Sequence, residues 1–313
     1  MKNFMKVKNI PLVKDFIKLI KEIKVPGLNS LSFYDLFELY VLGIINGILT
    51  VRAGSISFSF FMALFPFLLF ILNLIPFIPI DNLEIIVFDF IEIVLPNETQ
   101  DFFSDIFLDI KNKPRVGLLS SVFILSIFLS ANGVSSVFSS FEESYHVQLS
   151  RNIFRLYLFS IGVSILLAIL LLSAISFFVY YEIYILQNIK EFVPSEINLI
   201  RLGQTIFFCF SIYFSVSILY YFGTIEGKIA KFFSPGALMT TVLIIISTFV
   251  FGIYVEKFST YNRLYGSIGA LLIFMLYIWI NSILLLLGFE LNATLNRLKK
   301  NSIKDNLYKK SEK

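Results

Sequence analysis

The chain has almost no cysteine or histidine. Cys209 and His146 are the only residues of their kinds among 313. One cysteine excludes a disulfide within the chain, and with a single histidine a Cys/His metal cluster is excluded as well. The usual Ser-His-Asp and metal-hydrolase arrangements also lack parts, and no G-x-S-x-G, Walker loop or H-E-x-x-H occurs. We therefore expect no metal, no cofactor and no catalytic residue.

Charged residues are also scarce: they make up 15% of the chain, whereas hydrophobic residues make up 57%. In soluble domains about 25% of the residues are charged and about 45–50% are hydrophobic. Apolar runs of about 20 residues recur, and each is long enough to cross a hydrocarbon core of about 30 Å. Their uninterrupted pattern favours helices over the alternating pattern of a barrel. The sequence predicts an all-α polytopic membrane bundle.

The N-terminus lacks the anatomy of a signal peptide, because lysines interrupt its apolar residues and no small-residue cleavage site follows. Residues 11–23 place Phe16, Ile17 and Leu19 among Lys14 and Lys18. This pattern predicts a basic amphipathic helix on anionic lipid. Nucleic-acid binding is the alternative, but a lysine-rich arm of a membrane protein is usually a topology signal, so we expect no nucleic acid.

Six segments have the length and apolarity of transmembrane helices: about 53–76, 116–138, 153–181, 203–222, 235–256 and 266–292. With the N-terminus inside, the cytoplasmic parts carry 19 Lys and Arg and the outer parts carry 7. This satisfies the positive-inside rule and places both termini in the cytoplasm of a bacterial-type inner membrane. Residues 31–51 are interpreted as an interfacial helix, with a seventh span or a longer first helix as alternatives. The expected parts are therefore 1–51, a membrane domain 52–295 and a basic tail 296–313.

The loop at about 77–115 is the largest part expected outside the membrane. Asp101, Asp105 and Asp109 repeat at i, i+4, and an apolar face backs them. Two amphipathic helices that form a hairpin on the outer face are predicted. The acidic stripe is either a solvated face or a surface for a cation or a basic partner.

Rows of small and hydroxylated residues run along three predicted spans. They are Ser55, Ser59 and Ala63; then Ser126, Ser130, Gly133, Ser136 and Ser140 with Asn132 nearby; and then Ser160, Ser164 and Ala168. Such rows let helices approach closely in lipid. A polar transport path is the other interpretation, and both hold if the rows meet around a cavity.

Three residues within the predicted spans carry further functional potential. Pro66 interrupts the hydrogen bonding of the first span and can kink or hinge it. Asn281 lies in the middle of the sixth span, where an unsatisfied amide is costly. Glu290 lies near the inner end of the same helix. An intramembrane acid indicates a functional site, but a structural partner such as Arg52 or Arg155 is an equally good explanation.

Several stretches together resemble the YihY/virulence-factor BrkB family of bacterial inner-membrane proteins, once catalogued as "ribonuclease BN". The stretches are RAGSISFSFFMALFPFLLFIL (52–72), SANGVSSVFSSFEESYHV (130–147), SPGAL (234–238), FSTYNRLYGSIGALL (258–272) and LLLLGFELNATL (284–295). The resemblance implies six spans, cytoplasmic ends and an outer hairpin. Its motif positions here are Pro66, Gly133, Tyr145, Pro235, Gly236, Tyr261, Asn262, Tyr265, Gly266, Gly269, Glu290 and Asn292. Glu142 is a departure, because family members often have Asn before the Tyr.

Two functions are the main candidates, and a membrane enzyme is a third alternative. The first is a transporter- or flippase-like protein for a lipid or another amphiphilic envelope compound, and the second is an envelope scaffold that binds a partner through the acidic hairpin. Residues expected along a substrate path are Ser55, Ser59, Pro66, Ser130, Asn132, Gly133, Tyr261, Asn262, Tyr265, Gly266, Asn281, Glu290 and Asn292. Ribonuclease activity fits poorly, because RNA hydrolysis usually needs a metal cluster or paired acid–base groups in water. The sequence does not indicate an oligomeric state.

Overall fold

A computed structural model describes residues 34, 38, 48–74, 119–144, 147, 151–180, 197–225, 231–257 and 267–311. In these ranges all regular structure is α-helical. The long helices are α4 (Leu49–Leu74), α7 (Leu119–Glu142), α8 (Ile153–Tyr180), α10 (Ile197–Gly223), α11 (Pro235–Lys257) and α13 (Ser267–Ser311). The predicted basic helix at 11–23, the outer hairpin and most of 31–51 lie outside the described residues.

Five of the described helices contain a stretch long and apolar enough to cross a membrane. The stretches are Ser121–Glu142, Ile153–Phe178, Leu202–Gly223, Pro235–Tyr254 and Leu271–Leu298. The sixth helix, α4, adds a shorter apolar part, Leu49–Leu64, and runs on to Leu74. Large apolar side chains such as Ile124, Ile169 and Phe249 face outward along the bundle, as expected where lipid is the solvent. The predicted polytopic helical membrane bundle is confirmed.

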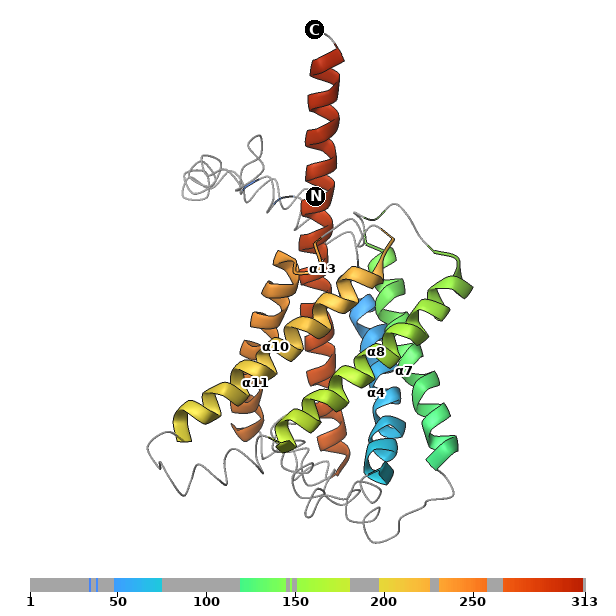
Figure 1. The fold of residues 1–313 in the computed structure, drawn as a ribbon, viewed down its shortest axis with the longest axis vertical. Coiled ribbons are helices and arrows are strands. Elements are labelled where there is room, and N and C mark those ends of the chain that lie inside the picture. The colour runs from blue at the N-terminus through green and yellow to red at the C-terminus, as the bar shows by residue number, and fades with distance from the viewer. Residues whose placement is uncertain are drawn as a thin grey trace.

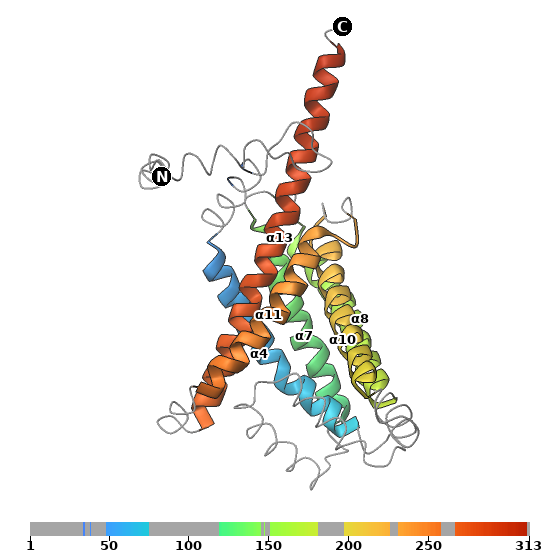
Figure 2. The same ribbon diagram turned by 90° about the vertical axis from the view of Figure 1, so that its left-hand side faces the viewer.

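The helices run up and down along the bundle (Figure 1). We call the end from which the last part of α13 projects the tail end, and the opposite end the far end. At the tail end α4, α8 and α11 begin, and α7 and α10 finish (Figures 1 and 2). With 45 residues α13 is about 67 Å long, more than twice the thickness of a hydrocarbon core. The predicted tail therefore continues the last span as one helix.

The start of α4 is set by Ile48, whose φ of 46° lies in the left-handed region that β-branched residues rarely adopt. The Ile48 carbonyl accepts hydrogen bonds from the amides of Val51 and Arg52, so it closes the first turn of α4. A right-handed helix does not continue backward through such a residue. The predicted first span, about 53–76, thus begins four residues earlier, at Leu49.

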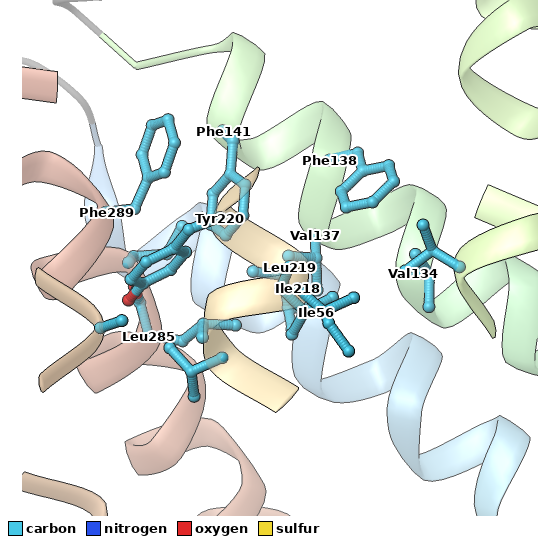
Figure 3. Packing of buried hydrophobic residues seen from close by; sticks show 14 of the residues in the cluster. Ile56, Val134, Val137, Phe138, Phe141, Ile218, Leu219, Tyr220, Leu285 and Phe289 are labelled. Atoms are coloured by element: carbon cyan, nitrogen blue, oxygen red, sulfur yellow. The ribbon is translucent and has the colours of Figure 1, made fainter. Parts of the chain in front are cut away.

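The helix α4 packs closely on α7 and α11 packs closely on α13, and α13 crosses α4 (Figure 2). The helices α8 and α10 lie next to each other on one side. The apolar core joins all six helices, most of its residues belong to α4, α7, α10 and α13, and three of its aromatic rings pack together (Figure 3). Phe141 stacks on Phe289 at 4.1 Å between ring centroids, and Tyr220 meets both rings edge-on.

Candidate functional site

A buried ion pair joins α4 to α13 near the tail end. Arg52 Nη1 lies 3.0 Å from Glu290 Oε1, and the two residues are 5% and 0% exposed. The second carboxylate oxygen accepts a hydrogen bond of 2.8 Å from the Ser144 hydroxyl, in the turn after α7. Arg52 Nη2 donates to the Ser140 carbonyl in the last turn of α7. A cation is favourable there, because the carbonyl end of a helix carries partial negative charge.

This arrangement ties three helices together through charges removed from water. The desolvation cost of a buried pair is offset only when good geometry and further hydrogen bonds satisfy both charges. Ser144 and the Ser140 carbonyl supply such bonds here. Of the two partners that the sequence suggested for Glu290, the structure selects Arg52, and Arg155 is exposed on α8.

A second polar group holds the beginning of α11. Ser234 is its N-cap, because its hydroxyl accepts the Ala237 amide at 3.2 Å, and Pro235 is the first helical residue. Asn292 of α13 completes the cap: its Oδ1 accepts the Gly236 amide at 2.9 Å, and its Nδ2 donates to Ser234 Oγ at 2.8 Å. The SPGAL and FELNATL stretches, far apart in sequence, thus form one contact.

The helices α11 and α13 also approach each other through two glycines. A Cβ at Gly288 would lie 1.8 Å from Thr240 Oγ1 and 2.6 Å from the Gly236 carbonyl oxygen. Any side chain at Gly288 would therefore push the helices apart. Tyr220 of α10 joins this contact, since its hydroxyl lies 2.6 Å from Thr240 Oγ1 and donates to the Leu285 carbonyl at 2.6 Å.

Glu142 and Arg151 connect the end of α7 to the start of α8. The Arg151 amide donates to Glu142 Oε2 at 3.0 Å. The Arg151 side chain donates from Nη1 to the Gly223 carbonyl at the end of α10. Burial lowers the pKa of the Arg151 guanidinium and the Glu142 charge opposes this effect, so the group stays cationic. Glu142, the departure from the family pattern, thus has a structural partner.

A cavity of about 380 Å³ lies between α4, α8, α10, α11 and α13, beside these polar groups. We call it the central cavity. Within the described part of the chain, its lining is apolar apart from Ser211, Ser215, Asn281 and Ser282. A side cavity of about 250 Å³ lies between α4, α7 and α8, and Phe60 and Leu171 line both cavities. Ligand sites are typically about 300–1,000 Å³ and mostly apolar, with a few polar groups.

The structure distributes the predicted path residues over different places. Asn281 lines the central cavity, and Ser130 and Gly133 line the side cavity. Ser55 instead bonds to Ser136 of α7 at 3.0 Å, and a Cβ at Gly133 would lie 3.8 Å from the Ser59 carbonyl oxygen. These contacts hold α4 against α7, as expected for rows of small residues.

The other predicted path residues that the structure describes do not line the two cavities. Asn132 is half-buried on α7. Pro66 lies inside a continuous α4, and its carbonyl accepts a hydrogen bond from Ser126 at 2.6 Å. Glu290 and Asn292 belong to the polar contacts at the tail end. Tyr261, Asn262, Tyr265 and Gly266 lie outside the described residues.

Four residues of the polar contacts were not identified as site residues from the sequence: Ser144, Tyr220, Ser234 and Thr240. A signal existed for one of them, since Ser followed by Pro before an apolar run is typical of a helix start. The others are ordinary polar residues, and only their tertiary partners distinguish them. Among the described residues, no group of three His, Cys, Asp or Glu side chains could hold a metal ion.

Comparison with known proteins finds a matching family profile and several relatives. The family profile described as "Virulence factor BrkB" matches residues 46–312 and takes in every helix described above. Ribonuclease-like protein YfkH of Bacillus subtilis (strain 168) is 28% identical over 255 residues. That alignment covers 80% of this chain and 90% of YfkH.

Shorter matches link the chain to proteins named only for their membrane location. UPF0761 membrane proteins of Xanthomonas oryzae pv. oryzae (strain PXO99A) and Xanthomonas axonopodis pv. citri (strain 306) are each 39% identical, over 61 and 62 residues. The matches cover 20% of this chain and 14% and 15% of those proteins. No solved structure matches this chain.

Proposed function

This chain belongs to the BrkB virulence factor family, and from that membership and the geometry above we propose that it is a carrier of the bacterial inner membrane. It moves a lipid or another amphiphilic envelope compound, in the manner of a transporter or flippase. The observation that carries the proposal is the central cavity: five helices surround a largely apolar space with a few polar groups, as a site for an amphiphile requires.

The carrier is oriented with its tail end in the cytoplasm. Twelve Lys and Arg lie among the described residues, and all but Arg201 and Lys257 belong to helix ends or segments at the tail end. The ten are Arg52, Arg151, Arg155, Lys231, Arg297, Lys299, Lys300, Lys304, Lys309 and Lys310. The positive-inside rule therefore supports cytoplasmic termini.

The ion pair closes the central cavity toward the cytoplasm. Ile56 and Leu285 line the cavity, and they lie four and five residues along their helices from Arg52 and Glu290. At 1.5 Å per residue the pair lies about 6–8 Å beyond these lining side chains. Between the ion pair and the cavity, the aromatic rings of Phe141, Tyr220 and Phe289 fill the bundle. These contacts support a carrier that is closed at the tail end in this state.

Opening would separate two rigid pairs of helices. The contacts Ser55–Ser136 and Ser126–Pro66 hold α4 on α7, and Asn292 with Gly288 holds α11 on α13. The bonds of Glu290 to Arg52 and Ser144 cross from one pair to the other. A small rotation of packed pairs about such contacts is a common means of alternating access.

Transport in proteoliposomes tests the proposal. Two lipids with a fluorescent label on the acyl chain are compared in parallel, a glycosylated diacylglycerol and a phosphatidylglycerol. Dithionite added outside quenches label in the outer leaflet, so the measurement is how fast the protein makes the inner-leaflet label accessible to it. We expect at least one lipid to move, and Asn281→Ala to slow it about five- to tenfold, as loss of a buried hydrogen bond predicts. Glu143→Gln and Ser176→Ala, on exposed positions, should have no effect. Equal rates with and without protein would refute the carrier.

The scaffold remains a second candidate because of one observation: the serine row of α4 is used for packing against α7. Its partner surface would be the acidic hairpin, outside the described residues. Crosslinking from Asp101, Asp105 and Asp109 tests this role, and recovery of a basic partner together with absent transport would favour it. We do not extend the ribonuclease-like name of the Bacillus relative to this chain, since no acid–base pair for RNA hydrolysis is evident in its sequence.

A further inference from the structure

The polar groups of the central cavity are almost all acceptors. The hydroxyls of Ser211, Ser215 and Ser282 each donate to the carbonyl four residues earlier in their own helix, at 2.8–2.9 Å. A serine hydroxyl has one hydrogen to donate but two lone pairs. Because that hydrogen is already used, each serine hydroxyl can still accept a hydrogen bond from a ligand but cannot donate one.

Asn281 also offers an acceptor, and the positions of its amide oxygen and nitrogen follow from chemistry. The amide atom 2.8 Å from the Tyr277 carbonyl oxygen must be Nδ2, because two carbonyl oxygens cannot share a hydrogen bond. The amide oxygen Oδ1 therefore points elsewhere, and it is buried in the cavity wall without a hydrogen-bond partner. A buried acceptor of this kind gains most from a ligand that donates to it.

Among the described residues, the lining of the cavity is also uncharged. None of these lining residues is Lys, Arg, His, Asp or Glu. The nearby guanidinium of Arg52 is already paired with Glu290. An anionic head group here would lose its hydration and find neither a cation nor more than one donor, and burial of an unpaired charge is costly.

From this pattern we propose that the central cavity takes an uncharged amphiphile whose head carries several hydroxyl donors, as a sugar- or polyol-headed lipid does. The head donates to the serine oxygens and, after a small shift of the Asn281 side chain, to its buried Oδ1, and an apolar chain extends past Phe60 and Leu171 into the side cavity. This inference rests on the proposed carrier function and specifies its substrate class. Anionic phospholipids are poor ligands of the same site.

Quenching of the single tryptophan, Trp279, tests the inference on the full-length protein. Trp279 lies in α13 between Ile278 and Asn281, which both line the cavity. Nanodiscs are titrated with three lipids that share dibrominated acyl chains: a glucosyl diacylglycerol, its tetra-O-methyl ether, and phosphatidylglycerol. The ether keeps every oxygen and loses every donor, whereas phosphatidylglycerol keeps hydroxyls and adds a negative charge. Since all three carry the same quencher, differences report the head group.

We expect saturable quenching by the glucosyl lipid at a concentration about five- to tenfold lower than by the ether or by phosphatidylglycerol. Asn281→Leu should reduce this gap to about twofold, while the control Ser176→Leu, on the exposed side of α8, should retain it. Equal saturation by the glucosyl lipid and its ether, preference for phosphatidylglycerol, or no saturation by any lipid would overturn the inference.

The outcome is separable from that of the transport assay. Selective saturation without transport would leave the ligand class standing and remove the carrier function. Transport of phosphatidylglycerol without selectivity for the glucosyl lipid would leave the carrier function standing and remove the ligand class.

Discussion

Glu290 is the most deeply buried acid among the described residues, and each of its oxygens has a donor of its own. Oε1 receives Arg52 and Oε2 receives Ser144. Because the pair sits between apolar helices, its net contribution to stability is small, while loss of one partner leaves a charge without compensation. The pair therefore specifies which faces of α4, α7 and α13 meet.

Removing one charge should be worse than removing both. We expect Glu290→Gln to lower the unfolding free energy by about 3–5 kcal/mol, because Arg52 remains buried and unpaired. The double variant Arg52→Met, Glu290→Leu should recover most of this loss. Thermal unfolding in one detergent measures both, with Glu143→Gln as the exposed control. A double variant less stable than the single one would contradict this interpretation of the pair.

The glycine contact between α11 and α13 gives a sharper residue-level prediction. Gly288→Ala would place a methyl group 1.8 Å from Thr240 Oγ1 and 2.6 Å from backbone at Gly236. We expect a loss of about 3 kcal/mol or more, as overpacking against backbone cannot relax by side-chain rotation. Gly252→Ala on α11, where nothing lies within 4 Å, should be neutral or slightly stabilising. Equal melting temperatures for the two variants would refute the close approach.

At this scale the sequence predicts residue types better than partners. Glu290 stood out because acids are rare within membrane spans, and Arg52 was one of two candidate partners. The bond that joins them spans 238 positions of sequence, and local patterns carry no information about such a pairing. Tyr220 and Thr240 gave no signal for the same reason.

At the scale of the element, Asn292 acts as a cap supplied by another helix. The first amides of a helix lack partners within it, and Asn292 satisfies the one at Gly236. We expect Asn292→Ala to cost about 1–2 kcal/mol and to speed hydrogen exchange at residues 235–238. Asn292→Asp keeps the acceptor oxygen, so its exchange rate and its stability should lie between those of the wild type and those of the alanine variant. Unchanged exchange in the alanine variant would contradict the capping role.

Helix positions could be predicted well because lipid thickness constrains them directly. The expected segments 116–138, 153–181, 203–222 and 235–256 overlap α7, α8, α10 and α11 almost throughout. Predictions at helix ends were weaker, since caps and tertiary contacts decide them. The apolar pattern does not indicate the 45-residue length of α13, because the polar last part of the helix ends the apolar signal without ending the helix.

On the scale of the whole molecule, an even number of spans returns the chain to its starting side. Alkaline phosphatase fused after residue 311 should be inactive, and fused within 77–115 it should be active, because the enzyme works only outside the cytoplasm. Green fluorescent protein should show the opposite pattern. Activity of the C-terminal phosphatase fusion would reverse the orientation and place the Arg52–Glu290 closure on the outer side.

The central cavity is the feature on which the carrier and its ligand class both depend. An experimental structure in nanodiscs of native envelope lipid tests it most directly. We expect elongated density between α4, α8, α10, α11 and α13, with its polar end within hydrogen-bonding distance of Asn281 and its chain beside Phe60. Helices packed together with side chains filling the 380 Å³ space, and no density beside Asn281, would contradict the account.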